Sequence, residues 1–166
     1  MSDQDGQLHV TFVCTGNICR SVMAEKMFAE QLRRRGLGDA VRVTSAGTGN
    51  WHVGKCADER ASRVLRAHGY PTDHCAAQVD ADHLAADLVV ALGRNHARMV
   101  RQLGADADRI RMLRSFDPRS GAHAADVDDP YYGDPQDFEE VFTVIEAALP
   151  GLHQWVDERL ERNGPG

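Results

Sequence analysis

The chain has 166 residues and a formal net charge of −6 at pH 7. This length suits one domain with a single well-buried core, so we expect one domain over residues 1–166 with flexible ends at residues 1–7 and 163–166. The acidic balance argues against general affinity for nucleic acid or acidic membranes. The four cysteines lack paired spacing, and no apolar run is long enough for a signal peptide or a membrane span. These features predict a cytoplasmic protein with neither nucleic-acid nor membrane partners.

The first predicted elements are a strand, a tight loop and a helix. Residues 8–13 are a run of β-branched and aromatic side chains, which predicts a strand. Residues 22–35 carry apolar side chains at helical spacing and end in three arginines before Gly36, a typical helix C-terminus. The sequence Cys-Thr-Gly-Asn-Ile-Cys-Arg-Ser of residues 14–21 joins the two. It therefore predicts a loop between a buried strand and a helix N-terminus.

This loop has the composition of a phosphate site. Its backbone N–H groups and the helix dipole favour an anion, and Arg20 would add two parallel hydrogen bonds to phosphate oxygens. The same positive field would hold Cys14 as a thiolate beneath the phosphorus. A nucleotide-binding P-loop would end in Gly-Lys-Ser/Thr, and zinc sites usually separate cysteines by two residues, so neither pattern fits. We expect a site that cleaves phosphate esters.

The remaining chain alternates between strands and helices. In chain order the predicted elements are strand 41–45, helix 57–68, short helix 82–86, strand 87–92, helix 94–103, strand 109–113, helix 136–148 and helix 152–160. Pro150 and Gly151 separate the last two. This alternation predicts an open α/β fold, a four-stranded parallel sheet with helices on both faces. Loops at the carboxyl ends of its strands should meet at one edge.

Two further loops should reach that edge. The glycine-rich loop 46–54 carries Trp51 and His52, and the long loop 114–135 carries several aspartates. Trp51 is either a lid on the core or a wall of the site. His52 and His74 with Cys56 and Cys75 lack the spacing of metal ligands, so we expect scattered surface or core residues and no metal.

Three motifs together resemble the low-molecular-weight protein tyrosine phosphatases, with the mycobacterial members closest in appearance. These motifs are the loop 14–21, Ser45-Ala46-Gly47-Thr48 and Asp129-Pro130-Tyr131-Tyr132-Gly133. The resemblance runs from about Leu8 to the last helix. It implies a sheet of order 2-1-3-4 and hydrolysis of phosphotyrosine in a protein substrate. It also implies export without a signal peptide. We expect no metal or organic cofactor, because Arg20 and the loop amides supply the positive field, and we expect a monomer.

The resemblance assigns roles to individual residues. Cys14 is the nucleophile, Arg20 the phosphate clamp and Asp129, rather than Asp126 or Asp128, the general acid. The residues expected to bind phosphate or to support the loop are Thr15, Gly16, Asn17, Ile18, Cys19, Ser21 and Ser45. Those expected to wall the pocket are Trp51, His52, Tyr131 and Tyr132.

Several of these residues carry more specific expectations. Ser45 would hydrogen-bond the side chain of Asn17, whose φ we expect to be positive. Ser21 would donate its hydroxyl to the Cys14 sulfur, cap the helix, or do both. Cys19 would either trap oxidised Cys14 as a disulfide or simply pack beneath the loop.

Two residues depart from the family pattern. Val22 stands where Pro is usual, so the loop is expected to be slightly less rigid. Gly93 stands where many members carry Asp, and this costs a helix N-cap at most a few tenths of a kcal/mol. In addition, Ile18 favours aromatic substrates, because the related arginine phosphatases have Thr there.

Two other functions compete with a tyrosine phosphatase. An arsenate reductase of the same fold passes a disulfide through two further cysteines on a mobile segment. Cys56 and Cys75 have eighteen residues and a predicted helix between them, which suits that relay poorly. A module that only binds phosphotyrosine would normally lack the nucleophile or the acid, and the sequence has both.

Overall fold

The computed structural model describes residues 7–50, 52–118, 126–127, 130 and 133–162. Its strands are β1 (Leu8–Cys14), β2 (Val41–Gly47), β3 (Leu88–Ala91) and β4 (Ile110–Met112). Its helices are α1 (Arg20–Arg34), α2 (Glu59–Ala67), α3 (Ala81–Leu84), α4 (Arg94–Leu103) and α5 (Pro135–Arg162), with 3-10 turns η1 (Ala107–Arg109) and η2 (Leu113–Phe116). The four strands form one parallel sheet of order β2-β1-β3-β4, which confirms the predicted fold.

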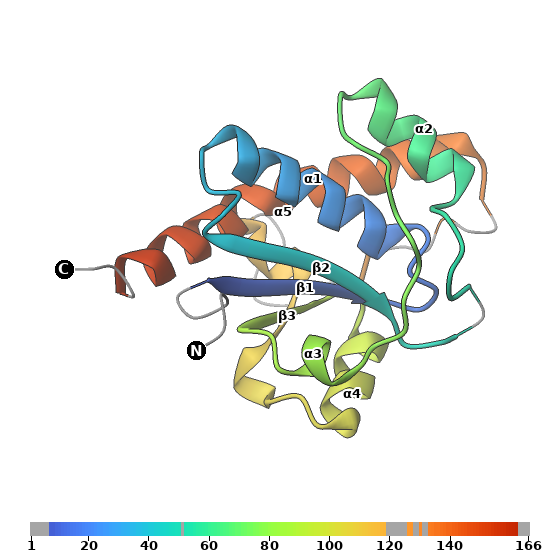
Figure 1. Ribbon diagram of the computed structural model, residues 1–166. Coiled ribbons are helices and arrows are strands. Elements are labelled where there is room, and N and C mark those ends of the chain that lie inside the picture. Colours follow the sequence, from blue (N-terminus) through green and yellow to red (C-terminus); the bar gives the residue numbers. More distant parts are fainter. Residues whose placement is uncertain (1–6, 51, 119–125, 128–129, 131–132, 163–166) are drawn as a thin grey trace.

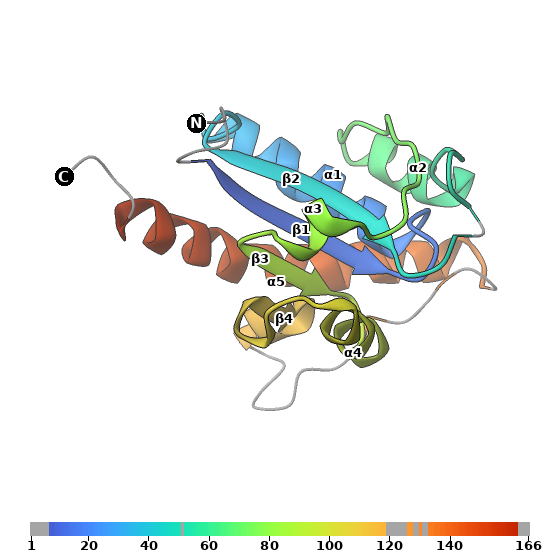
Figure 2. The same cartoon turned by 60° about the horizontal axis from the view of Figure 1, so that its bottom comes forward.

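Helices cover both faces of the sheet (Figures 1 and 2). α1, α2 and α5 lie on one face and pack against one another, whereas α3 and α4 lie on the other. Alternate residues of β1 pack against the two layers of helices. The Phe12 ring packs edge-on against Phe28 of α1, and Val13 packs with Val89 and Val100 on the opposite face of the sheet. β1 is therefore buried over its whole length.

The register of the sheet brings the carboxyl ends of three strands together. Cys14 pairs with Gly47 of β2, and Val13 pairs with Ala91 of β3. β1 and β2 each extend beyond their predicted last residues. Their ends and the start of α1 form the edge where the predicted site lies.

The predicted break at Pro150 and Gly151 is wrong, because α5 is one continuous helix. Proline in a helix interior loses a hydrogen bond, but the leucine before Pro150 and the one two positions after it are fully buried. A Cβ on Gly151 would collide with the carbonyl of Phe116 in η2. Gly151 thus allows close packing of the helix on η2, and burial of the flanking leucines outweighs the missing hydrogen bond.

The arginines at the end of α1 are tied to neighbouring side chains. Arg33 and Arg34 donate to Glu30 one turn earlier, and these bonds lower the pKa of Glu30 to about 2. Arg35 forms a two-pronged ion pair with Asp157 of α5. This last pair links the C-terminal ends of the two long helices.

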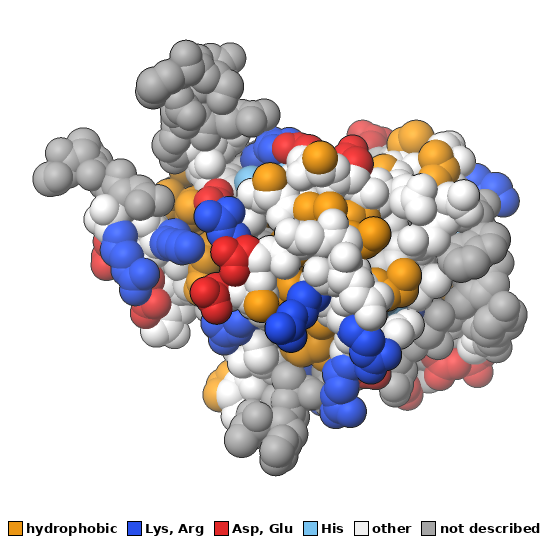
Figure 3. Space-filling view, turned by 90° about the horizontal axis from the view of Figure 1, so that it is seen from below, with side chains coloured by type: hydrophobic (Ala, Val, Ile, Leu, Met, Phe, Trp, Pro, Cys, Tyr) orange, Lys and Arg blue, Asp and Glu red, His pale blue; other side chains and the backbone are white. Residues whose placement is uncertain are grey.

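The surface that carries α3 and α4 is chemically mixed (Figure 3). In this view basic, acidic and apolar side chains alternate, and none forms a continuous field. Among the described large hydrophobic side chains, Val53 and Leu103 are each 54% exposed. No helix of the described chain combines the length and apolar character needed to cross a membrane.

Candidate active site

The loop of residues 14–20, called the phosphate loop after its predicted ligand, is fastened to the end of β2. Thr48 N–H donates to the Cys14 carbonyl at 2.9 Å, and Gly49 N–H donates to the Thr15 carbonyl at 2.9 Å. A Cβ at Gly47 would lie 2.6 Å from that same Thr15 oxygen, so a side chain at 47 would push the loop away. This close approach accounts for a glycine in the Ser-Ala-Gly-Thr motif.

Asn17 organises the loop from inside. Among the described residues it alone has a positive φ without being a glycine, at 58°, as the sequence predicted. Ala77 N–H donates to its Oδ1 at 2.9 Å, which fixes the orientation of the amide. Its Nδ2 therefore faces two serines and donates to Ser21 Oγ at 2.8 Å and to Ser45 Oγ at 2.9 Å. The predicted hydrogen bond between Asn17 and Ser45 is present.

The fixed orientation of the Asn17 amide also constrains the hydroxyl groups of Ser21 and Ser45. Each hydroxyl accepts a hydrogen bond from Asn17, so its single hydrogen is left for another partner. Ser45 donates to Oε1 of Glu25, a carboxylate that can only accept. Ser21 Oγ lies 2.9 Å from Cys14 Sγ, so its hydrogen is available to the sulfur when Cys14 is a thiolate, which can only accept. A donor in this position stabilises negative charge on Cys14.

Of the two roles predicted for Ser21, capping of the helix is wrong. α1 begins at Arg20, and its N-cap is Cys19, whose side chain makes no capping hydrogen bond. Ser21 lies inside the first turn and is fully buried. Its hydroxyl is thus occupied by the Cys14 sulfur and by Asn17.

Arg20 joins the phosphate loop to the segment that carries the predicted acid. This segment, residues 126–133, is called the acid loop. The buried Arg20 side chain donates from Nη1 to the Val127 carbonyl at 3.0 Å, and Val127 N–H donates to the Leu92 carbonyl at 2.7 Å. One residue of the acid loop therefore contacts both the arginine and the end of β3.

Four predicted site residues lie outside the described part of the chain. They are Trp51, Asp129, Tyr131 and Tyr132. Their described neighbours are anchored: Pro130 is buried, and the Gly133 carbonyl accepts from Arg60 of α2 at 3.0 Å.

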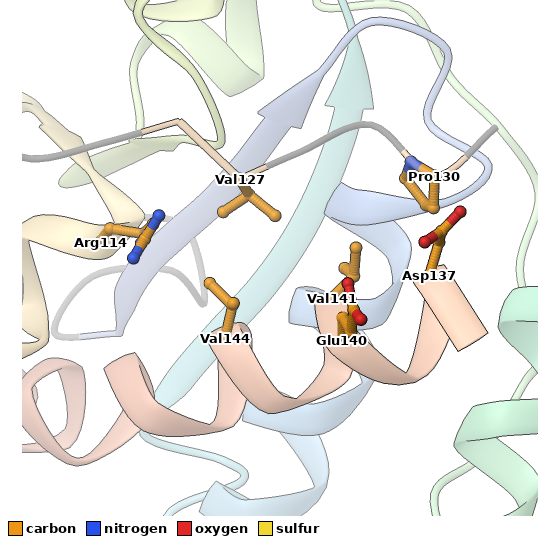
Figure 4. A pocket seen from close by; sticks show the side chains of 7 residues that line it. All are labelled: Arg114, Val127, Pro130, Asp137, Glu140, Val141 and Val144. Atoms are coloured by element: carbon orange, nitrogen blue, oxygen red, sulfur yellow. The ribbon is translucent and has the colours of Figure 1, made fainter. Parts of the chain in front are cut away.

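A cavity of about 300 Å³ lies between the acid loop and α5 (Figure 4). It is lined by Arg114, Val127, Pro130, Asp137, Glu140, Val141 and Val144. The side chain of Val144 points from the helix toward Val127, and the Arg114 guanidinium closes one side. Val127 and Pro130 of the acid loop thus face α5 across this cavity.

Asp126 explains how the fold accommodates Gly93. Gly93 is the N-cap of α4 and has no side chain to cap it. Asp126 supplies the missing group, because its Oδ1 accepts from Arg94 N–H at 2.9 Å. A Cβ at Gly93 would lie 3.5 Å from the Asp126 carboxyl carbon. The Asp126 carboxylate therefore already occupies the space that a capping side chain at position 93 would fill. The acid loop therefore also caps α4.

Three histidines contact the phosphate loop. A Cβ on Gly16 would lie 2.8 Å from the His52 ring, so this glycine makes room for a predicted wall residue. His96 of α4 hydrogen-bonds Thr15 Oγ1 at 2.9 Å. His74 Nε2 donates to the Asn17 carbonyl at 2.6 Å, and burial lowers the pKa of this ring.

Sequence reasoning missed His74, His96 and Glu25. The sequence indicated no role for His74, which donates to the Asn17 carbonyl and so supports the phosphate loop. Local sequence patterns carry no signal for these contacts, because each partner comes from a different part of the chain. In the described chain, no group of three or more His, Cys, Asp or Glu side chains is arranged to hold a metal ion.

Comparisons with known proteins agree with this geometry. A sequence profile of the family "Low molecular weight phosphotyrosine protein phosphatase" matches residues 9–163. "Low molecular weight protein-tyrosine phosphatase A" of Mycobacterium tuberculosis is 83% identical over 158 residues, covering 95% of this chain and 97% of the relative. A low molecular weight protein-tyrosine-phosphatase of Streptomyces coelicolor is 48% identical over 156 residues, covering 92% and 95%.

Solved structures show the same likeness. A protein tyrosine phosphatase from Entamoeba histolytica superposes with a TM-score of 0.84 at 27% identity and covers 92% of this chain and 98% of its own. YfkJ from Bacillus subtilis gives a TM-score of 0.84 at 32% identity, covering 92% and 96%. The chain belongs to the low molecular weight phosphotyrosine protein phosphatase family.

Proposed function

We propose that this low molecular weight protein tyrosine phosphatase hydrolyses phosphotyrosine in protein substrates through a phosphocysteine intermediate, as a monomer. The observation that carries the mechanism is the buried hydrogen bond between Ser21 and Cys14 Sγ. It supports a sulfur that is held as a nucleophile before substrate binds. The neighbouring Arg20 supplies the clamp that a dianionic phosphate needs.

In the first step the Cys14 sulfur attacks phosphorus in line with the tyrosine oxygen. A sulfur–phosphorus bond forms as the bond from phosphorus to the phenolic oxygen breaks. Arg20 and the loop amides stabilise the charge on the three equatorial oxygens. Asp129 protonates the departing phenolate, which is otherwise a poor leaving group because its pKa is about 10.

In the second step water attacks the phosphocysteine. Asp129, now a carboxylate, takes a proton from this water, and the bond from sulfur to phosphorus breaks. The Ser21 hydroxyl donates its hydrogen bond to the sulfur as negative charge returns to it. Inorganic phosphate leaves, and Cys14 and Asp129 are restored to their starting forms.

Replacement of the nucleophile tests this mechanism. Cys14→Ser should abolish turnover of p-nitrophenyl phosphate but retain binding of a phosphotyrosine peptide, because the amides and Arg20 remain. Steady-state kinetics and calorimetric titration measure the two properties. Cys56→Ser, an exposed cysteine outside the loop, is the matched control and should keep its activity. Turnover of the Cys14→Ser protein near that of the unsubstituted protein would refute the proposal.

The acid assignment has its own test. Asp129→Asn should slow aryl phosphate hydrolysis by about 10²–10⁴-fold, with the largest loss for the poorest leaving group. A series of substituted phenyl phosphates gives this dependence. Asp128→Asn is the matched control, and a larger loss in that variant would transfer the acid role to Asp128.

A further inference from the structure

The segments on either side of α2 run side by side in opposite directions. One leads from β2 into the helix and carries Cys56, and the other returns from it and carries Cys75. Both views of the ribbon show the two segments adjacent (Figures 1 and 2). Eighteen residues that include α2 separate these cysteines in sequence.

The hydrogen bonds define how the segments are aligned. Gly54 N–H donates to the Ala76 carbonyl at 2.8 Å, and Ala76 N–H donates to the Lys55 carbonyl at 2.8 Å. Two residues on one segment thus oppose one on the other, the pattern of an antiparallel β-bulge that begins with a glycine. Gly54 has φ of 86°, and Lys55 N–H closes a tight turn by donating to the His52 carbonyl at 2.9 Å. Gly54 is the third residue of this four-residue turn, a position where a type II turn requires positive φ and therefore favours glycine.

Continued by one residue on each segment, this antiparallel alignment sets Cys56 opposite Cys75. They follow the bonded pair of Lys55 and Ala76, which corresponds to a non-hydrogen-bonded position of an antiparallel pair. In such pairs the Cα atoms lie about 4.5 Å apart and the side chains share one face. A disulfide spans Cα separations of about 4.4–6.8 Å. Both cysteines are exposed, whereas Ala76, the residue after Cys75, is buried.

A second set of contacts holds the same two segments in place. Asp58 N–H donates to the Ile18 carbonyl at 2.8 Å, two residues after Cys56. His74, which precedes Cys75, donates to the Asn17 carbonyl at 2.6 Å. Each segment is therefore hydrogen-bonded to one of two adjacent residues of the phosphate loop. These bonds hold the segment that carries Cys56 and the segment that carries Cys75 at the same place.

We propose that Cys56 and Cys75 are a redox-active pair that forms a reversible cross-strand disulfide. The oxidant is a low-molecular-weight disulfide such as oxidised glutathione. One cysteine thiolate attacks this disulfide, forms a mixed disulfide and releases one glutathione thiolate. The second cysteine, as a thiolate, attacks the protein sulfur of the mixed disulfide and releases the other glutathione thiolate. The protein loses two electrons and two protons, and one molecule of oxidised glutathione becomes two of reduced glutathione.

The disulfide would join the two segments that are hydrogen-bonded to the phosphate loop. It closes the chain from residue 56 to residue 75 around α2, which restricts the unfolded chain more than the folded one. Because the hydrogen bonds already align the two segments in antiparallel fashion, we expect closure to leave the contacts with Asn17 and Ile18 in place. The oxidised protein is thus the more stable form.

Peptide mapping after oxidation tests this pairing. The reduced protein is equilibrated in a glutathione redox buffer, alkylated, digested with trypsin without reduction and analysed by mass spectrometry. The expected product joins the peptide of residues 56–60 to that of residues 67–94. A bond between Cys14 and Cys19 stays inside the single peptide that ends at Arg20, so the two disulfides are distinguished. Cys75→Ser should instead retain glutathione on Cys56.

Thermal unfolding provides the second readout. Oxidation should raise the unfolding midpoint by about 5–10 °C, the effect expected for a loop of this length in a domain of this size. The double variant Cys56→Ser/Cys75→Ser should show no such rise, and this comparison is best made in a Cys14→Ser background to remove the other reactive thiol. Glutathione adducts on both cysteines without cross-linked peptides would overturn the proposal. A cross-link that lowers the midpoint would overturn it as well, since only a distorted or unfolded chain would then form the bond.

Discussion

Cys14, the proposed nucleophile, contacts a buried network of polar side chains. A buried chain of hydrogen bonds begins at Ala77 N–H and branches at Asn17. One branch leads through Ser21 to Cys14 Sγ, and the other leads through Ser45 to Glu25. Buried networks of this kind are effective only when each member is satisfied. Here each hydrogen bond pairs one donor with one acceptor. Removal of one side chain of the network should therefore weaken the stabilisation of negative charge on the Cys14 sulfur.

Ser21 is the member in direct contact with the sulfur. Ser21→Ala should lower kcat for p-nitrophenyl phosphate by about 10- to 100-fold, since a hydrogen bond to a charged group contributes about 1.5–3 kcal/mol. KM should change much less, because Arg20 and the loop amides remain. Full kinetic profiles against pH measure both quantities. Ser62→Ala, a buried serine of α2, is the matched control, and an equal loss in that variant would show a general effect of packing.

Single residues could be predicted from the sequence where one short stretch holds the whole arrangement. Cys14 and Arg20 fall in one loop whose flanking strand and helix have clear periodicity, and both are where the pattern placed them. His96 and Glu25 could not be predicted in this way. Their contacts depend on which side chains the crossovers of the sheet bring opposite the loop, and no local pattern encodes that.

At the scale of elements, α4 and the acid loop depend on each other. Asp126 caps α4 from 32 positions along the chain, and the next residue, Val127, accepts from Arg20. The predicted helix and the observed one have identical bounds at Arg94–Leu103, yet the sequence pattern could not indicate how its N-terminus is satisfied. In contrast, the predicted break in α5 was wrong because η2 packs against Gly151.

The shared cap predicts a non-additive pair of substitutions. Asp126→Ala should lower the free energy of unfolding by about 1 kcal/mol through loss of the α4 cap. Gly93→Asp should restore a few tenths of a kcal/mol in that background, the usual difference between Gly and Asp at an N-cap, because the φ of −153° at Gly93 is open to any residue. In the unsubstituted protein the new carboxylate meets Asp126, and no gain is expected. Urea unfolding of the four proteins measures the coupling, and simple additivity would contradict the shared cap.

At the scale of the whole molecule, His9 links stability to pH. Its Nδ1 accepts from Arg42 at 3.1 Å, and its Nε2 donates to Thr44 Oγ1 at 2.7 Å, so the ring is neutral. Burial, and after it the Arg42 charge, lower the pKa of His9 from 6.5 to about 4. Between these values the unfolded chain binds the proton more strongly than the folded one. The contribution of His9 to stability is thus full above about pH 6.5 and is lost as the pH falls toward 4.

Replacement of this ring should flatten the response to acid. His9→Gln keeps a donor for Thr44 and an acceptor for Arg42 but does not titrate in this range. Its free energy of unfolding should decrease less between pH 7 and pH 4.5 than that of the unsubstituted protein. Some decrease should remain, because burial also lowers the pKa values of His74 and His153. Equal slopes in the two proteins would show that His9 does not control this behaviour.

The hydrogen-bonded chain beneath Cys14 also has a direction that neither end can reverse. A backbone N–H can only donate at Ala77, and the Glu25 carboxylate can only accept. A flip of the Asn17 amide would break its bond with Ala77, so Ser21 accepts from Asn17 and keeps its own hydrogen for a Cys14 thiolate. The dipoles that face the sulfur are consequently oriented as the chain folds, and no turnover has to reorient them. The reaction begins with its electrostatic field already assembled.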